Sequence, residues 1–119
     1  MSIRKSFAKF ARQVTGRIAH EDLADLTRME THDFYDAAKK EYISATGHRQ
    51  EDGQWEVRVT HGRERGIMFS NLDDILGRNL TQEVAITLLE KFEADHVNLK
   101  RCVNTTINLP LVSKVRKAL

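Results

Sequence analysis

Five histidines, one cysteine and two pairs of carboxylates are the side chains in this sequence that could carry out catalysis or bind a metal ion. The carboxylate pairs are Asp33 with Asp36 and Asp73 with Asp74, each in or near the first turn of a predicted helix, where negative charge is favourable for stability alone. No two histidines have the spacing of a metal-binding pair on one helix face, and Cys102 has no suggestive partner in the sequence. The sequence therefore predicts a protein that is not an enzyme, has no catalytic residue, metal or cofactor, and acts by binding.

Basic residues are concentrated at the two ends of the chain. Residues 1–17 contain five basic side chains and no acidic one, and residues 100–119 also contain five and none. Residues 18–47 instead contain three basic and seven acidic side chains. If the ends lie close together, they form a positive patch that suits phosphate groups, although a solvated basic helix face and a membrane-surface or acidic-partner contact are alternatives. The N-terminal candidates for nucleic-acid contact are Arg4, Lys5, Lys9 and Arg12.

The apolar spacing predicts an α+β protein that is mainly helical, with four to five helices and one two-stranded β-hairpin. We expect residues 1–119 to form a single domain. Its three parts are a basic amphipathic helix in residues 1–19, two helices and the hairpin in residues 20–70, and a long helix with a basic C-terminal segment in residues 71–119. The expected helices span residues 3–15, 20–29, 31–47, 72–76 and 81–103, with a last basic turn near the C-terminus.

The hairpin is predicted between residues 54 and 69. Trp55, Val57 and Val59 alternate with polar residues, as in a strand with one buried face, and the alternation resumes after a turn in residues 62–66. Because two strands alone are marginally stable in water, this apolar face must pack against helices. Of these helices, the one that Thr81 can cap has the longest apolar stripe.

Residues 20–70 resemble a winged helix-turn-helix domain. Leu23, Ala24, Met29 and Phe34 are the residue types that two crossed helices require where they pack, and the hairpin takes the place of the wing. The resemblance implies a DNA-binding transcriptional regulator whose second helix lies in the major groove. It also implies a homodimer, paired through the helix from Thr81 to Val103.

The resemblance assigns roles to six polar residues, in addition to the N-terminal ones. His32, Tyr35 and Lys39 would approach base edges or nearby phosphates from the major groove. Lys40, Arg63 and Arg65 would contact phosphates. Taken singly, the tyrosine is also explained as a half-buried helix residue and the histidine as a surface residue at a helix start.

A protein-binding adaptor or inhibitor is the alternative function. The basic ends and acidic middle of the chain would suit docking on a charged surface of a larger macromolecular machine. Phe7, Phe10 and Trp55 would then include aromatic anchors, unless they fill the core.

The sequence also indicates a location. A lone cysteine fits a reducing compartment, so the cytoplasm is expected. The longest uncharged run, residues 102–113, is too short and too polar to cross a bilayer, so we expect no membrane span. The basic N-terminus lacks the uninterrupted apolar core of a secretory signal, and an organelle transit peptide is the alternative to an ordinary first helix there.

Overall fold

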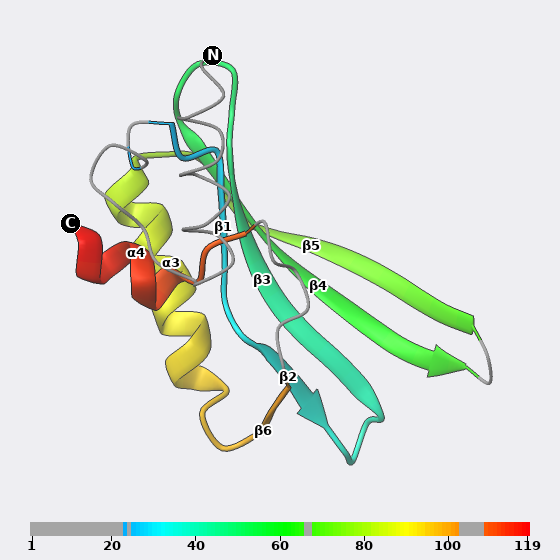
Figure 1. Ribbon diagram of the computed structural model, residues 1–119. Helices are drawn as coiled ribbons and strands as arrows, with labels where there is room; N and C mark the ends of the chain where they lie inside the picture. The colour runs from blue at the N-terminus through cyan, green and yellow to red at the C-terminus, as the bar shows by residue number, and fades with distance from the viewer. Residues whose placement is uncertain (1–22, 24, 66–67, 103–108) are drawn as a thin grey trace, which may run out of the picture.

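The computed structural model describes residues 23, 25–65, 68–102 and 109–119, and within them the chain is built mainly of β-strands (Figure 1). The strands form one antiparallel sheet, and two helices pack beside it. The predicted mainly helical fold with four to five helices is therefore wrong. In chain order the elements are β1 (Arg28–Glu30), β2 (Asp33–Asp36), β3 (Glu41–Arg49), β4 (Trp55–Arg65), β5 (Met68–Leu80), α3 (Gln82–Asp95), β6 (Lys100–Cys102) and α4 (Val112–Ala118).

The sheet has the strand order β5-β4-β3-β2-β6, and β1 also pairs with β3. β1 and β2 are thus one interrupted neighbour of β3, with the interruption at Thr31 and His32. There the Thr31 hydroxyl accepts a hydrogen bond from the Ala45 backbone N–H at 3.0 Å and donates one to the His32 carbonyl at 2.9 Å. Thr31 therefore keeps β3 paired where its neighbour breaks.

The segment predicted as the second helix of the helix-turn-helix, residues 31–47, forms β2, a turn and β3 instead. Asp36 ends β2, and its Oδ1 accepts hydrogen bonds from the backbone N–H groups of Ala38 at 3.0 Å and Lys39 at 3.3 Å. Lys40 completes the turn with a left-handed φ of 52°. Because the Asp36 side chain satisfies these backbone groups locally, it favours the turn over a helix.

The predicted hairpin is present, and it is longer than expected. β4 and β5 pair over their whole described lengths, and the ribbon they form extends away from the helices in Figure 1. Residues 72–76, predicted as a helical turn, continue this pairing as part of β5. Gly62 likewise lies inside β4, so the turn comes later than predicted. Register shifts around Val57 bend β5 near its end, where Asn79 has a left-handed φ of 56°.

α3 begins where the sequence predicts and ends earlier. Thr81 is its N-cap, and the threonine hydroxyl accepts a hydrogen bond from the Val84 backbone N–H at 3.2 Å. The helix ends at Asp95 and residues 100–102 form β6, so the predicted extension to Val103 is wrong. α4 confirms the predicted last basic turn.

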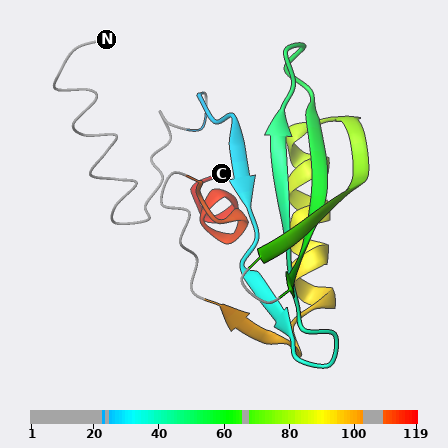
Figure 2. The same cartoon turned by 90° about the vertical axis from the view of Figure 1, so that its right-hand side faces the viewer.

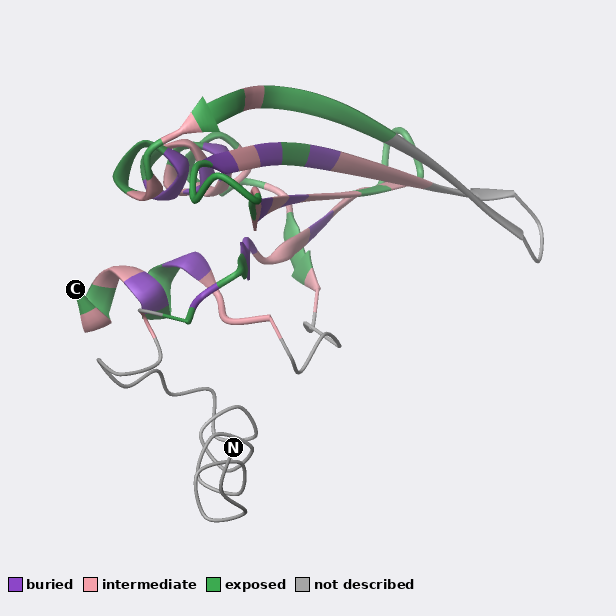
Figure 3. Ribbon diagram, turned by 90° about the horizontal axis from the view of Figure 1, so that it is seen from above, coloured by how far each residue is buried: buried purple, intermediate pink, exposed green. Residues whose placement is uncertain are grey.

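The core lies between α3 and one face of the sheet. Buried residues alternate with half-buried or exposed ones along β4 (Figure 3), and Trp55 and Val57 are among the buried ones. Gly47 of β3 lies opposite Val57, and a Cβ at this position would come within 3.3 Å of Leu89 of α3 and of Met29. Glycine is therefore needed there because the helix and β1 approach the strand closely.

α4 lies beside α3, and the two helices are joined by an ion-pair network. The guanidinium group of Arg116 contacts Glu90 at 2.6 Å and Glu83 at 2.5 Å. We call the side of the sheet that packs against α3 the helix face and the opposite side the open face. Figure 2 shows the open face toward the viewer, with α3 behind the strands. The buried residues of α3 belong to the core, and the pairing of two copies through this helix stays a prediction.

Several predictions fall partly or wholly outside the described residues. The helix predicted for residues 3–15 is one of these, and Val103, the last residue of the helix predicted for residues 81–103, is another. In the predicted helix of residues 20–29, the last positions belong to β1, so the helical prediction is wrong at residues 28 and 29. Neither described helix is long and apolar enough to cross a membrane.

Candidate functional site

Neither described helix lies over the open face of the sheet (Figure 2), and the residues at its strand positions are mainly polar or aromatic. In an antiparallel sheet, directly paired residues point to the same face, and successive residues point to opposite faces. Because Phe34 and Ala45 are buried on the helix face, the alternate positions of β2 and β3 belong to the open face. These include every second residue of β3 from Tyr42 to His48, and their partners on β1, β2 and β4.

An arginine patch lies at one end of the open face, and we define it as Arg28, His48, Glu56, Arg58 and Arg78. The first three form a row across β1, β3 and β4. The Glu56 carboxylate forms an ion pair with Arg58 and lies 3.8 Å from Nε of Arg78 on β5. The side chains of Arg58 and Arg78 are 45% and 60% exposed, whereas that of Glu56 is 13% exposed. The patch therefore presents mainly positive charge to solvent.

His48 lies in a positive environment. Its burial and then the guanidinium groups of Arg28 and Arg58 lower the pKa of His48 below its ordinary 6.5, while Glu56 and Asp73 act in the opposite direction. The imidazole is therefore neutral at pH 7. The patch then carries three positive charges and one negative charge, which suits an anion.

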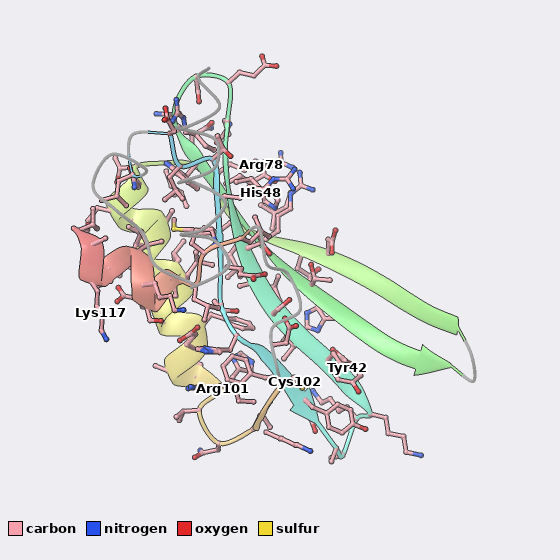
Figure 4. The ribbon with its side chains drawn as sticks, in the orientation of Figure 1. Tyr42, His48, Arg78, Arg101, Cys102 and Lys117 are labelled. Atoms are coloured by element: carbon pink, nitrogen blue, oxygen red, sulfur yellow. The ribbon has the colours of Figure 1, made fainter. Side chains whose placement is uncertain are left out.

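A pair of tyrosines lies at the other end of the open face. Tyr35 of β2 is directly opposite Tyr42 of β3, with ring centroids 4.8 Å apart and an angle of 41° between the ring planes. Tyr42 is 38% exposed, and Figure 4 shows it at the far end of the sheet from His48 and Arg78. His48 follows Tyr42 by six positions along β3, a distance of about 20 Å at the usual rise of a strand.

Lysines surround the tyrosine pair. Lys100 of β6 is directly opposite Tyr35, and Lys39 and Lys40 are exposed in the turn between β2 and β3. We refer to Tyr35, Tyr42, Lys39, Lys40 and Lys100 as the aromatic end. It combines exposed ring surface with positive charge, a combination that suits flat anionic ligands.

Hydroxyl groups and two carboxylates connect the arginine patch to the aromatic end. The Thr60 hydroxyl donates a hydrogen bond to Asp73 at 2.9 Å, and Ser44 is hydrogen-bonded to Asp33. Burial raises the pKa of Asp33 above its ordinary 3.8, although the bond from Ser44 and the nearby charge of His32 oppose this rise. Both carboxylates are thus engaged with neighbouring hydroxyl groups.

The structure brings together only some of the residues predicted to contact nucleic acid. Tyr35, Lys39 and Lys40 lie together at the aromatic end, on a strand and a turn rather than on a recognition helix. His32 instead faces α3, because its backbone N–H donates to Glu93 Oε1 at 2.9 Å and its Nδ1 lies 3.1 Å from the same oxygen.

The remaining predicted residues lie on or outside the limits of the described structure. Arg63 and Arg65 belong to β4, whereas they were predicted in the hairpin turn, and their side chains are outside the described atoms. Their contacts with phosphates stay predictions. The N-terminal candidates Arg4, Lys5, Lys9 and Arg12 also lie outside the described residues.

Sequence reasoning missed the larger part of the open face. Arg28, His48, Arg58 and Arg78 come from four separate strands, and only the fold places them side by side. A signal was nevertheless present, because polar residues occupy every second position of residues 42–48 and 56–60. Such alternation indicates one solvated sheet face.

A second polar cluster lies on the helix face of the projecting ribbon. Nδ1 of His61 is hydrogen-bonded to Glu41, and its Nε2 lies 3.3 Å from Oδ2 of Asp74. Both ring nitrogens are thus engaged by carboxylates, which leaves neither in a position to act as a general base. Among the described residues, no group of three or more metal-ligating side chains is placed to hold an ion.

Comparisons with known proteins give no relative from which a role can be transferred. No family model matches the chain, and neither the curated proteins nor the solved structures contain a significant match. The geometry of the open face is therefore the observation that bears on function.

Proposed function

We propose that this protein binds single-stranded nucleic acid across the open face of its sheet. The observation that carries the proposal is the tyrosine pair, Tyr35 and Tyr42, flanked by lysines and lying on the same face as the arginine patch. Bases stack on exposed aromatic rings whatever their sequence, while arginines and lysines contact the backbone phosphates. The strand would run along β3, with bases over the tyrosines and phosphates over the arginines.

A single strand fits this face better than a duplex does. Bases in a duplex are stacked on one another, so they are not free to stack on Tyr42. A helix is one element that can enter the major groove of a duplex, and residues 31–47, where such a helix was predicted, form strands. The proposal therefore retains the predicted nucleic-acid contacts at Tyr35, Lys39 and Lys40 and changes the ligand from duplex to single strand.

The charge of the open face supports a polyanionic ligand. Arg58, Arg78 and Lys100 are exposed, whereas the carboxylates of Glu56, Asp33 and Asp73 are hydrogen-bonded or ion-paired to neighbouring side chains. Of these carboxylates, Glu56 and Asp33 are half-buried and Asp73 is exposed, so a strand meets more positive than negative charge on this face. A reducing compartment also suits the lone Cys102, so we keep the cytoplasm as the proposed location.

The test is fluorescence anisotropy with the full chain and a labelled single-stranded oligonucleotide of about 12 nucleotides. The Tyr42→Ala variant loses one stacking surface, which is worth about 1–3 kcal/mol, so we expect roughly 5- to 150-fold weaker binding. Tyr42→Phe keeps the ring and should bind within about twofold of the parent protein. Lys117→Ala, on α4, is the control for a change of similar size far from the open face.

Two results would count against this function. If Tyr42→Ala binds the oligonucleotide as tightly as the parent protein does, the tyrosine pair is not a stacking surface. If a duplex of the same sequence binds more tightly than the single strand, the open face is not the principal site.

A protein-binding adaptor is the second candidate, and β5 is the observation that favours it. β5 is an edge strand of the described sheet, and Ile75 and Leu76 on it are 44% and 49% exposed. Such an edge can accept a strand from a partner. Its bulges and the neighbouring Asp73 and Asp74 resist that pairing, which places this candidate second. Replacing Ile75 with serine, which adds no charge opposite Arg58, should impair an adaptor and leave oligonucleotide binding unchanged.

A further inference from the structure

Three cationic or potentially cationic side chains at the arginine patch converge from different strands. Arg28 and His48 are direct cross-strand neighbours on β1 and β3, and Arg58 on β4 lies one row away on the same face. Directly opposed side chains in an antiparallel pair have Cβ atoms about 5 Å apart, and diagonal neighbours are within about 8 Å. Arg28 and Arg58 flank β3 on opposite sides, and their long side chains can both reach a tetrahedral anion held above His48.

We propose that this part of the patch binds one phosphate group, between Arg28, His48 and Arg58, and that His48 takes up a proton when the phosphate binds. The inference rests on the proposed function for the source of the phosphate, which is the backbone of the bound strand. It goes beyond that function because it names a single phosphate site and makes occupation of the site dependent on pH.

The charges around His48 explain the proton uptake. Arg28 faces it from β1, Arg58 and Glu56 face it from β4, and Asp73 faces it from β5. In the free protein, burial and the two guanidinium groups disfavour the imidazolium form. A bound phosphate supplies negative charge to the same place, so the imidazolium becomes favourable and can donate a further hydrogen bond to the phosphate.

In the free protein, Glu56 interacts with two arginines of the patch. Its carboxylate is paired with Arg58 and lies 3.8 Å from Arg78, so it competes with phosphate for at least one guanidinium group. This competition makes the site selective, because a weakly charged anion does not displace the carboxylate. A phosphate that also accepts a hydrogen bond from protonated His48 binds more strongly, and so competes better with Glu56 for Arg58.

The first arm of the test uses inorganic phosphate as the probe. The ring Cε1–H signals of the full chain are followed by NMR through a pH titration, in phosphate and in chloride at the same ionic strength. His48→Gln identifies the His48 signal, and the other histidines serve as internal references. We expect phosphate to raise the pKa of His48 by about 1. Arg58→Ala should abolish this rise, whereas Lys117→Ala should retain it.

The second arm uses the single-stranded oligonucleotide and calorimetry in two buffers of different ionisation enthalpy. We expect proton uptake on binding near pH 7 and none with His48→Gln. If both arms succeed, the site and its phosphate source are supported. If inorganic phosphate raises the pKa of His48 but no strand binds, the site stands and the proposed function fails. If a strand binds and neither arm shows a change at His48, the inference is overturned and the function stands. If neither arm gives a signal, both are overturned.

Discussion

Tyr35 and Tyr42 lie directly opposite each other on β2 and β3, with ring centroids 4.8 Å apart. The turn that joins these strands is held by Asp36, so the two rings are placed together by a short local element. An aromatic pair fixed in this way loses little side-chain freedom on binding a base, which favours stacking.

Lys100 should contribute one phosphate contact. It lies opposite Tyr35 on β6, at the aromatic end of the open face. For a single strand, each phosphate contact contributes about 0.7 to the slope of log Kd against log salt concentration. Lys100→Ala should therefore lower that slope by about 0.7, and Lys117→Ala should leave it unchanged. An equal slope in the parent protein and Lys100→Ala would remove Lys100 from the interface.

Glu56→Gln should tighten strand binding. The substitution keeps the size of the side chain, removes one negative charge and releases Arg58 and Arg78 from their ion pairs. We expect roughly three- to tenfold lower Kd at low salt, with a smaller gain as salt screens the charges. Asp95→Asn at the end of α3 makes the same charge change away from the open face and should have less than half this effect in log Kd. Weaker binding by Glu56→Gln would show that the carboxylate supports the site.

Asp33→Asn should stabilise the fold at neutral pH. Burial raises the pKa of Asp33 above 3.8, so the folded protein binds the carboxyl proton more tightly than the unfolded chain does. The free energy of unfolding that this group contributes therefore falls as pH rises from about 3.8 through the raised pKa. The uncharged amide of the variant avoids this cost, and we expect less than about 1 kcal/mol of added stability at pH 7.

Urea unfolding at pH 7 and at pH 3 checks this expectation. The gain from Asp33→Asn should disappear at pH 3, where the carboxyl group is protonated in both states. Asp25→Asn is the control, because Asp25 is an exposed carboxylate outside the sheet. A loss of stability at pH 7 would mean that the negative charge of Asp33 is favourable in the fold.

Thr81→Ala should destabilise the protein through the loss of the α3 cap. The threonine hydroxyl accepts the Val84 backbone N–H, and such caps contribute about 1 kcal/mol. We expect a fall of about 4 °C in the midpoint of thermal unfolding. Thr87→Ala in the same helix is the matched control, since the Thr87 hydroxyl only bonds back to the Glu83 carbonyl. Equal midpoints for Thr81→Ala and the parent protein would show that the cap is dispensable.

The parts of the fold that depend on local contacts could be predicted from the sequence. Thr81 precedes a helix whose apolar stripe runs through Leu89 and Phe92, and the cap and the first turns are where they were predicted. Trp55, Val57 and Val59 alternate with polar residues, and they form a strand of the predicted hairpin. In both segments one periodicity clearly dominates, so the local pattern alone indicates whether a helix or a strand forms.

The segment from residue 31 to residue 47 could not be predicted in this way. Phe34, Tyr42 and Ala45 match helical spacing, yet Tyr42 points to the open face and the other two to the core. The strands are stabilised by partners far along the chain, since β2 pairs with β6. Long-range pairing of this kind is invisible to local patterns, and it overrides helix propensity.

The arginine patch shows the same limitation for the candidate site. Arg28 and Arg78 are 50 positions apart in the sequence and lie on the same polar region of the open face only because β1, β3, β4 and β5 pair in this order. Tyr35, Lys39 and Lys40 were predicted as nucleic-acid contacts on a recognition helix, whereas they lie on a strand and a turn. They lie close together because the turn held by Asp36 directly joins β2 to β3.

The most direct test of single-strand binding by the open face is NMR mapping of backbone amide shifts as the oligonucleotide is added to the full chain. The proposal predicts that the largest changes fall on β3 and β4 at alternate positions from Tyr42 to His48 and from Glu56 to Thr60, and at Tyr35. Changes confined to α3 and α4, or no change at saturating oligonucleotide, would contradict it.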